Sequence, residues 1–387
     1  MRGSKVKDLG RILLSAALFS AAASQAAEDH SETRSKSSAK VFKVGVLLSL
    51  TGDFKATGVE IRQGAQIAAH EFADHSGGKA RIELVFVDDE SSVEVASRRA
   101  EALVREHKVH AVVGPSFLAG ASVAAPLFET AKIPFVVPLS KTATWSASKN
   151  ARFMRLEEAK LGDALARFAL KNLRVKTFAL IDEATSDASK SFNDGFSRAL
   201  AAQKKIRNVG RFSFIGANEE APKLLGELAK LKADAVSLPT TSWEAARAFL
   251  DLAPASGVPA LFLGSSSWAI PAEAKKVPGP IGHFFADVFS VSQPGARGFI
   301  ESFRKEYSED PSGLAAMSFE AVSVLGQAYR KAGYQDEGKL QVALQASTGF
   351  DGIAGKLRFD RDSSPVRDVV IMETTQSGIP RFRGIIR

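Results

Sequence analysis

Short apolar runs alternate along the chain with longer segments whose apolar residues recur every three or four positions. Runs typical of strands lie at 41–50, 82–87, 109–113 and 134–138. The run at 82–87 is apolar on both faces, as buried parallel strands are. Between the first two runs, Ile61, Ala65 and Ala68 share one face of a predicted helix. This β-α-β-α order predicts a parallel sheet with helices on both faces.

The same alternation resumes in the second half of the chain. Further strand-like runs lie at 178–182, 233–238 and 259–263. Phe192, Phe196 and Leu200 form the apolar stripe of the helix after the first of these runs. The pattern therefore predicts two doubly wound α/β units. Because open α/β sheets bind ligands beyond the carboxyl ends of their strands, the informative loops follow these runs. They begin after Leu50, Val113, Pro138, Asp182, Leu238 and Leu263.

The N-terminus has the features of a secretory signal peptide. Four basic residues precede an apolar run at 12–23, and Ser24-Gln25-Ala26 fits the small-x-small cleavage pattern. We expect residues 1–26 to be removed on export, and residues 27–40 to form a flexible leader. The alternative is a cytosolic amphipathic helix. No Cys follows the apolar run, which disfavours a lipid-anchored protein.

Composition narrows the class further. A chain of 387 residues predicts two or three domains, and its 45% hydrophobic content excludes global disorder. The absence of Cys excludes disulfides, thiol nucleophiles and Cys-ligated zinc. The net charge of +8 falls to +5 once the signal peptide is removed, and no basic cluster is interleaved with aromatic residues. Nucleic acid is therefore a poor candidate for a partner.

Enzyme motifs are missing from the sequence. The six His residues make no metal-binding helical pair, and no Gly-x-Ser-x-Gly motif or phosphate loop is present. Ser146 and Lys149 match Ser-x-x-Lys by letter, without the accompanying motifs of that enzyme class. The acidic run 88–90 lacks the ligand spacing of a metal site. We expect no enzymatic activity, no cofactor and no metal.

Several segments, in order along the chain, point to one family. Leu50-Thr51-Gly52 is followed by Gly58 and Gly64, then by the strand and turn at 109–115, and near the C-terminus by GFDGIAGKLRFDRD at 349–362. Together they resemble the periplasmic substrate-binding proteins of ABC transporters, in the leucine/isoleucine/valine-binding class. The resemblance covers nearly all of residues 41–387.

The resemblance implies a type I periplasmic binding fold, which is an α/β fold of two doubly wound parallel-sheet lobes joined by a three-segment hinge. Carried over, lobe 1 comprises 41–155 plus 290–345, and lobe 2 comprises 156–289 plus 346–387. The segment at 349–360 would return the chain to lobe 2. A small ligand would bind between the lobes by hinge closure. The implied partner is an ABC permease in the inner membrane, and the implied state is a monomer.

The resemblance also implies which residues contact the ligand from lobe 1. In amino-acid binders of this class, the loop after the Gly-Pro turn and the next strand-end loop hold the ligand's carboxylate and amine. The residues here are Ser116, Phe117, Leu118, Leu139, Ser140, Lys141 and Thr142. Phe117 and Leu118 replace the usual Ser residues, so this part of the pocket departs from the class. Lys141 would face an anionic ligand such as a carboxylate; the alternative is a surface or inter-lobe lysine.

The implied contacts from lobe 2 depart from the class as well. They are Glu157, Asp187, Thr241, Trp243 and Ser266. Ser266 aligns near the acid that usually holds the ammonium, so Asp187, Glu157 or the neighbouring Glu158 would have to replace it. Packing is the alternative role for Phe117 and Trp243. The sequence thus predicts an amino-acid site remodelled toward an amino-acid-like or carboxylate ligand.

Three functional classes remain open from the sequence. The favoured one is the solute receptor of an ABC importer. The second is a ligand-sensing or regulatory receptor on the same fold, since fold does not fix the partner. The third, an exported enzyme, is disfavoured because no catalytic constellation is present.

Overall fold

The computed structural model describes residues 39–141, 145, 148, 150–269, 280–335, 338–345 and 349–387. The predicted signal peptide and nearly all of the predicted leader lie outside the described residues. Within the described ranges, no helix combines the length and the apolar character needed to cross a membrane.

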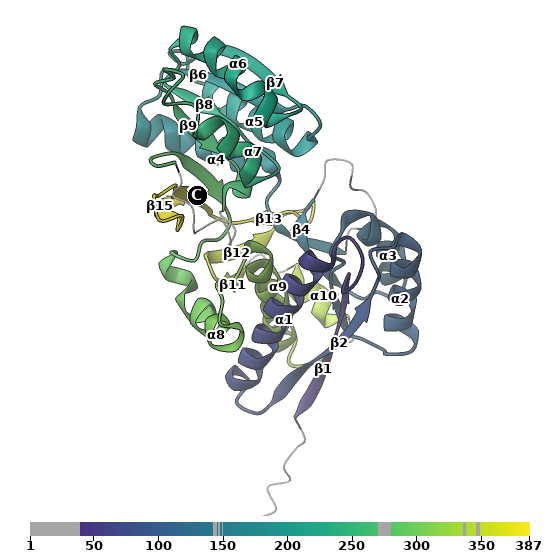
Figure 1. The fold of residues 1–387 in the computed structure, drawn as a ribbon. Helices are drawn as coiled ribbons and strands as arrows, with labels where there is room; N and C mark the ends of the chain where they lie inside the picture. The colour runs from purple at the N-terminus through teal and green to yellow at the C-terminus, as the bar shows by residue number, and fades with distance from the viewer. Residues whose placement is uncertain are drawn as a thin grey trace, which may run out of the picture. The chain divides into compact units, whose positions relative to one another are not determined.

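The first sheet has five parallel strands, in the order β2-β1-β3-β4-β5 (Figure 1). Its strands are β1 (Lys40–Leu48), β2 (Ala80–Asp88), β3 (Ala111–Val113), β4 (Phe135–Ser140) and β5 (Ala151–Arg155). The helices packed with it are α1 (Lys55–His75), α2 (Val93–Arg105), α3 (Leu118–Thr130), α8 (Arg297–Tyr307), α9 (Gly313–Lys331) and α10 (Lys339–Leu344). Val112 packs with α2 and α3, whereas its neighbour Val113 packs with α1 and α9, so both faces are covered.

The second sheet has seven strands, in the order β15-β14-β10-β9-β8-β6-β7. They are β6 (Thr177–Glu183), β7 (Arg207–Phe214), β8 (Ala235–Ser237), β9 (Leu261–Gly264), β10 (Phe284–Asp287), β14 (Val369–Glu373) and β15 (Arg381–Ile386). Strands β6 to β10 are parallel, and β14 and β15 add an antiparallel edge. The helical segments are α4 (Glu158–Phe168), η1 (Ala169–Leu173), α5 (Asp187–Ala201), α6 (Ala217–Leu231), α7 (Trp243–Leu250) and the short turns η2 (Ser266–Trp268) and η4 (Pro294–Ala296).

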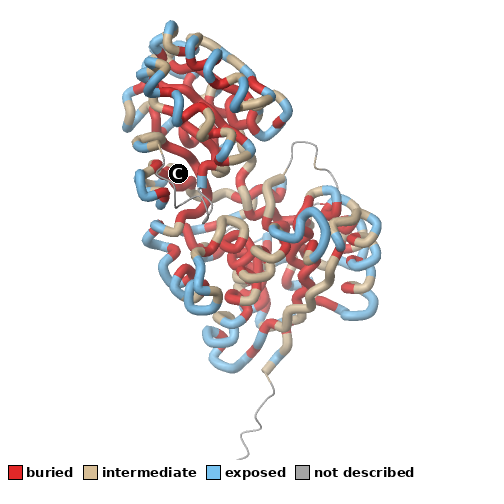
Figure 2. The backbone as a smooth tube through the Cα atoms, viewed as in Figure 1, coloured by how far each residue is buried: buried red, intermediate tan, exposed pale blue. Residues whose placement is uncertain are grey.

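The core of each sheet layer matches the pattern of the sequence. Phe192, Phe196 and Leu200 are fully buried on α5, and Ile61 and Ala65 are fully buried on α1. Figure 2 shows that buried residues gather in the interior of the molecule; they include all of β8 and β10, whereas the edge strand β15 has none. The predicted fold class, parallel-sheet α/β in two units, is confirmed, and the strand boundaries differ from the predicted ones by a few residues.

Close helix contacts depend on glycine. A Cβ on Gly64 would lie 1.9 Å from the carbonyl oxygen of Ala315, where α1 crosses α9. On α4 and α5 the contact is reciprocal, because Gly162 faces the backbone of Phe192 and Gly195 faces the backbone of Ala159. These positions let the helix backbones approach each other more closely than any larger residue would permit.

The chain passes between the two sheet layers through three segments: 155–158, 288–296 and 366–369. A third, small sheet of β11 (Phe350–Gly352), β12 (Gly355–Phe359) and β13 (Pro365–Val366) precedes the last of these segments. β11 packs on α9, and β13 packs on β5. The lobe boundaries remain a prediction. This packing supports a proposal that the final return to lobe 2 follows Val366 rather than 349–360.

A buried ion pair joins the three crossing segments. Arg367 Nη1 donates to Glu320 Oε2 on α9 at 2.6 Å, and the two side chains are 2% and 1% exposed. The same guanidinium donates to the carbonyl oxygens of Met154 and Val288, beside the other two crossings. Glu320 Oε1 also accepts the backbone N–H of Ile353 at 2.8 Å. One side chain therefore holds the backbone of all three crossings.

Breaking this pair should be costly. Glu320→Gln leaves the Arg367 charge buried without a counter-charge, so the free energy of unfolding should fall by about 3 kcal/mol. Urea denaturation measures the change. Glu101→Gln is the matched control, because Glu101 pairs with Arg105 at 3.0 Å on an exposed helix face and should change stability by less than about 0.5 kcal/mol. Equal losses in the two variants would contradict the structural role of the buried pair.

Candidate functional site

Ser116 lies at the carboxyl end of the first sheet, where its hydroxyl is engaged within the protein. Its Oγ accepts the backbone N–H of Ser49 at 2.8 Å and donates to Ser49 Oγ at 3.0 Å. Ser49 Oγ in turn donates to Asp89 Oδ1 at 2.6 Å, and all three residues are buried. Burial raises the pKa of the Asp89 carboxyl. Ser116 thus ties the loop after β1 to the loop after β3.

Phe117 forms an apolar rim beside this network. Its ring stacks on that of Phe54, with centroids 5.1 Å apart and planes at 8°. Phe117 is 7% exposed and Phe54 is 42% exposed, so one face of the pair is open to solvent. A Cβ on Gly120 would lie 2.7 Å from the Phe117 ring, so this glycine makes room for the ring. Leu118 is half-buried at the start of α3 and packs on the core.

The loop after β4 holds the next predicted contacts. Leu139 packs on the core of the first sheet, and Ser140 pairs with Arg155 in the β4–β5 register. Lys141 Nζ donates to the carbonyl oxygen of Asp362 at 3.0 Å. Thr142 lies outside the described residues. Lys141 is therefore engaged with the β12–β13 loop, and its contact with a ligand stays a prediction.

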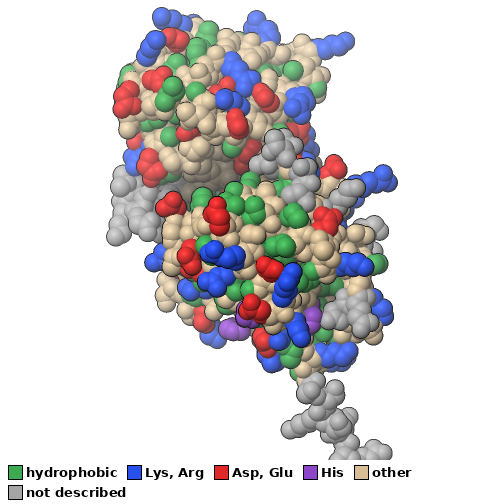
Figure 3. Space-filling model, turned by 90° about the vertical axis from the view of Figure 1, so that its right-hand side faces the viewer, with side chains coloured by type: hydrophobic (Ala, Val, Ile, Leu, Met, Phe, Trp, Pro, Cys, Tyr) green, Lys and Arg blue, Asp and Glu red, His purple; other side chains and the backbone are tan. Residues whose placement is uncertain are grey.

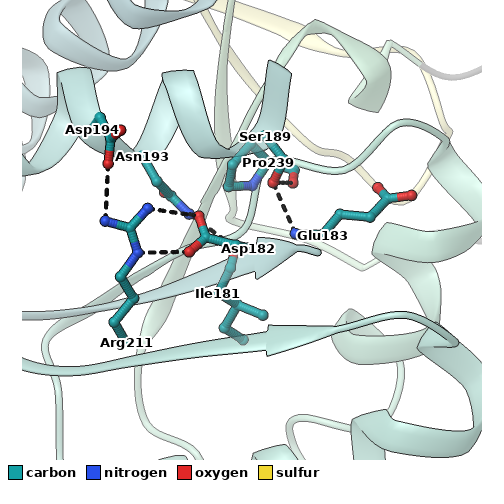
Figure 4. Close-up of polar contacts among 8 residues, drawn as sticks. All are labelled: Ile181, Asp182, Glu183, Ser189, Asn193, Asp194, Arg211 and Pro239. Carbon is teal, nitrogen blue, oxygen red and sulfur yellow. Dashed lines mark hydrogen bonds and ion pairs between the residues drawn. The ribbon is translucent and has the colours of Figure 1, made fainter. Parts of the chain in front are cut away.

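Charged side chains brace the second sheet where β6 meets α5 (Figure 4). Arg211 on β7 donates to Asp182 Oδ2 at 2.6 Å and to Asp194 Oδ1 at 2.9 Å. Asn193 Nδ2 donates to Asp182 Oδ1 and to the carbonyl oxygen of Ile181, both at 2.9 Å. The end of β6 is thus fixed against both β7 and α5.

The loops after β6 and β8 are joined to each other. Ser189 Oγ accepts the backbone N–H of Glu183 and donates to the carbonyl oxygen of Pro239, as Figure 4 shows. The Glu183 carboxylate accepts the N–H and the hydroxyl of Thr241, both at 2.7 Å. Trp243 is 3% exposed and lies in the core of the second sheet, so it has the packing role. Thr241 lies at the strand ends, with its hydroxyl committed to Glu183.

Asp187 and Glu157, two candidate partners for a ligand ammonium, lie apart. Asp187 opens α5 with a fully exposed side chain and pairs with Lys190 at 3.8 Å. Glu157 precedes α4 and accepts a hydrogen bond from Ser364 Oγ at 3.1 Å. The structure does not bring these two acids together.

One cluster at the strand ends links the two sheets. Arg155, the last residue of β5, donates from Nη2 to Ser266 Oγ at 2.8 Å. The same nitrogen lies 4.0 Å from Asp287 Oδ1 at the end of β10, and the two side chains are 20% and 7% exposed. Ser266 is a predicted contact; Arg155 is an addition from the structure. In the sequence, the family resemblance aligns Arg155 with an Arg-Thr pair that an acid usually follows, here Arg155-Leu156-Glu157-Glu158.

Glu158 completes this cluster, which we call the Arg155 cluster: Arg155, Glu158, Ser266 and Asp287. Burial raises the pKa of the Glu158 carboxyl to about 7; Arg155 opposes that rise and Asp287 adds to it. Burial likewise raises the pKa of Asp287, against the attraction of Arg155. The cluster therefore holds a carboxyl that titrates near neutral pH beside a permanently charged guanidinium.

A cavity of about 400 Å³ lies beside Asp287. Phe285, Phe289 and Phe303 supply apolar lining, and Glu60 on α1 supplies an acid. Burial raises the pKa of Glu60, while a hydrogen bond from Ser312 opposes that rise. Asp287 is thus shared between this cavity and the Arg155 cluster.

The fold and the strand-end polar groups define a two-sheet α/β binding protein. The family model described as periplasmic binding protein matches residues 41–378, so the chain belongs to that family. No curated protein sequence matches the chain.

Solved structures share the fold over nearly the whole chain. A leucine-binding protein from Thermotoga maritima is 24% identical, with 89% of this chain and 98% of that chain covered and a TM-score of 0.67. A branched-chain amino acid transporter substrate-binding protein from Streptococcus pneumoniae, solved with isoleucine, is 22% identical over 90% and 99% of the chains, with a TM-score of 0.69. A solute-binding protein of an ABC transporter from R. palustris, solved with benzoate, is 21% identical over 89% and 96%, with a TM-score of 0.65.

The family and these neighbours are binding proteins. Across the part of the chain that the structure describes, no group of three or more His, Cys, Asp or Glu side chains is placed to hold a metal ion.

The pKa of Glu158 predicts a pH effect on stability. Its folded pKa of about 7 exceeds that of a free glutamate, so the folded state binds more protons. The stability gained is present below about pH 4.5 and is lost as pH rises through 7, an effect of about 2–3 kcal/mol. Glu158→Gln should therefore match the wild type at pH 5 and unfold a few degrees higher at pH 8.

Thermal unfolding at each pH measures this difference. The buried His283, whose pKa is lowered to about 4, is present in both proteins, so its own pH effect cancels in the comparison. Glu101→Gln should show no such trend. A Glu158→Gln variant that is less stable than the wild type at pH 8 would contradict the raised pKa.

Proposed function

We propose that the protein is a periplasmic solute receptor of an ABC importer. It binds a small amino-acid-like or carboxylate ligand between two lobes and closes around it. The observation that carries the proposal is the Arg155 cluster, in which side chains from the strand ends of both sheets meet at a crossing segment. Membership of the periplasmic binding protein family supports it.

Two features of the fold suit binding by closure: the strand-end loops are held by internal hydrogen bonds, and few segments connect the two sheet layers. The loops that face the site are braced from within, through Ser49 and Ser116 in the first sheet and through Glu183 and Thr241 in the second. Within the described ranges, three segments connect the sheet layers, so rotation about them would move the walls as units. Closure would be driven by ligand contacts that exist in the closed form alone.

The proposed ligand chemistry rests on which acidic side chains of the protein are free to hold a ligand's α-amine. Isoleucine and benzoate, the ligands of two structural neighbours, share a carboxylate and an apolar body but differ in the α-amine. In this chain the Phe54–Phe117 pair offers an apolar surface. Asp187 is turned to solvent, and Glu157 accepts a hydrogen bond within the protein. The third candidate acid, Glu158, lies beside Arg155, whose charge opposes the binding of an ammonium. These placements favour a site remodelled away from α-amino acids.

In the cell, the proposed receptor would act in the periplasm. We propose export through a cleaved signal peptide at residues 1–26, action as a monomer, and delivery of the ligand to a permease in the inner membrane. Figure 3 shows acidic and basic side chains interspersed on one face of the molecule.

A ligand panel tests this function. Thermal unfolding of residues 27–387 is followed with aliphatic and aromatic amino acids, aromatic carboxylates, dicarboxylates and amides. A ligand at about 100 times its Kd stabilises by about 2.7 kcal/mol and should raise the Tm by several degrees. The protein is first unfolded in denaturant and refolded, so that co-purifying ligand is removed.

The outcomes separate the alternatives. A shift with carboxylates that lack an α-amine supports the remodelled site. A shift with Leu or Val in preference to those carboxylates would contradict remodelling while leaving the receptor function intact. Refolded protein that responds to no member of the panel would count against a receptor of amino-acid-like or carboxylate ligands.

A further inference from the structure

We propose that Arg155 and Ser266 are the specificity-determining residues of the site, and that they recognise a carboxylate on the ligand. This inference rests on the proposed function and names the charge that the receptor selects. The apolar remainder of the ligand would lie toward the Phe54–Phe117 pair or into the cavity beside Asp287.

Arg155 has hydrogen-bonding capacity to spare. A guanidinium carries five N–H donors in a planar fork that fits a carboxylate. Among the described residues, that of Arg155 makes one hydrogen bond, to Ser266 Oγ, and its contact with Asp287 is 4.0 Å, beyond hydrogen-bond distance. Its side chain is 20% exposed, so the remaining donors are accessible to a ligand while being partly shielded from water.

The other basic groups nearby are already committed. Lys141 donates to the carbonyl oxygen of Asp362, and Lys160 pairs with Asp360 at 3.7 Å. Arg367 is 2% exposed and engaged with Glu320. Arg155 thus combines a strand-end position, partial exposure and unused donors.

The positions of Arg155 and Ser266 also couple recognition of the ligand carboxylate to closure of the two lobes. Arg155 ends the last strand of the first sheet, and Ser266 follows β9 of the second sheet. A carboxylate held by both residues would contact both sides of the hinge, and Ser266 Oγ–H becomes available to it as a donor. Contacts from both sides are what make a ligand favour the closed form.

Charge in the cluster predicts a proton linked to binding. Arg155 from β5 and Asp287 from β10 act on Glu158, and Arg367, which precedes β14, acts on Asp287. A bound carboxylate would add a negative charge beside Glu158 and share Arg155, so the pKa of Glu158 should rise further and a proton should be taken up. Affinity should therefore increase as the pH falls through 7.

The test uses benzoate as the probe and benzamide as its neutral isostere. Titration calorimetry at pH 7 on the refolded wild type should show binding of benzoate and at least about tenfold weaker binding of benzamide. Arg155→Ala should weaken benzoate binding by about thirtyfold, and Arg155→Lys should restore part of it. Ser266→Ala should cost about threefold to tenfold.

The matched control is Arg105→Ala, which removes an exposed arginine from α2, 76% of whose side chain is exposed, and should leave benzoate affinity unchanged. Circular dichroism confirms that each variant is folded. Equal binding of benzoate and benzamide, or an Arg155→Ala variant that binds benzoate as the wild type does, would overturn the inference.

The dependence of the benzoate Kd on pH distinguishes carboxylate recognition by the Arg155 cluster from a merely structural role of that cluster. The Kd for benzoate in the wild type should tighten by about threefold to tenfold between pH 8 and pH 6. Calorimetry in buffers of different ionisation enthalpy should detect proton uptake. Glu158→Gln should bind benzoate with a flat profile over this range. A wild-type profile as flat as that of Glu158→Gln would overturn the linked protonation.

The same experiments distinguish failure of this inference from failure of the proposed function. If leucine binds the wild type and Arg155→Ala equally while benzoate does not bind, the receptor function stands and recognition through Arg155 is refuted. If neither probe nor any other member of the panel binds, both are refuted.

Discussion

The buried pair of Arg367 and Glu320 is the constraint on which the rest of the structure depends. Arg367 itself lies on the third segment that crosses between the sheet layers. Its guanidinium donates to the carbonyl oxygens of Met154 and Val288, at the other two crossing segments. Such a pair is no net gain over a hydrophobic contact, since both charges lose their hydration. Its value here is geometric, because a planar fork fixes several backbone groups at once. An apolar replacement could fill the space without fixing those positions.

Charge in the crossing region is divided between two environments. Arg367 and Glu320 are sealed from water and pair with each other. The second environment is at the strand ends, with Arg155, Asp287 and Glu158. There the Arg155 guanidinium is partly exposed and lies 4.0 Å from the Asp287 carboxylate. Burial raises the pKa of Glu158 to about 7, and the charge of Arg155 only partly opposes that rise. An incompletely satisfied cluster of this kind is a more plausible recognition element than a saturated one.

Many polar residues at the strand ends act on the protein itself. Ser116, Thr241 and Lys141 were expected to contact the ligand, yet each makes hydrogen bonds that join one loop to another. This bracing is consistent with binding in rigid units, because walls that are already ordered lose little entropy when a ligand arrives. Their roles could not be read from the sequence, since a polar side chain near a strand end can bind a ligand or join two loops.

The sequence by itself determined the alternation of strands and helices, the parallel sheets and the apolar stripes such as that of Phe192, Phe196 and Leu200. It could do so because burial imposes a period on neighbouring residues, and that period is a local property. Tertiary structure alone decided which strand-end residues are packed in the core and which are free to contact a ligand. Trp243 joined the core, Phe117 stacked on Phe54, and Arg155 met Ser266 from 111 positions away. Partners so distant in the chain are set by how the two sheets are joined, and no local pattern records them.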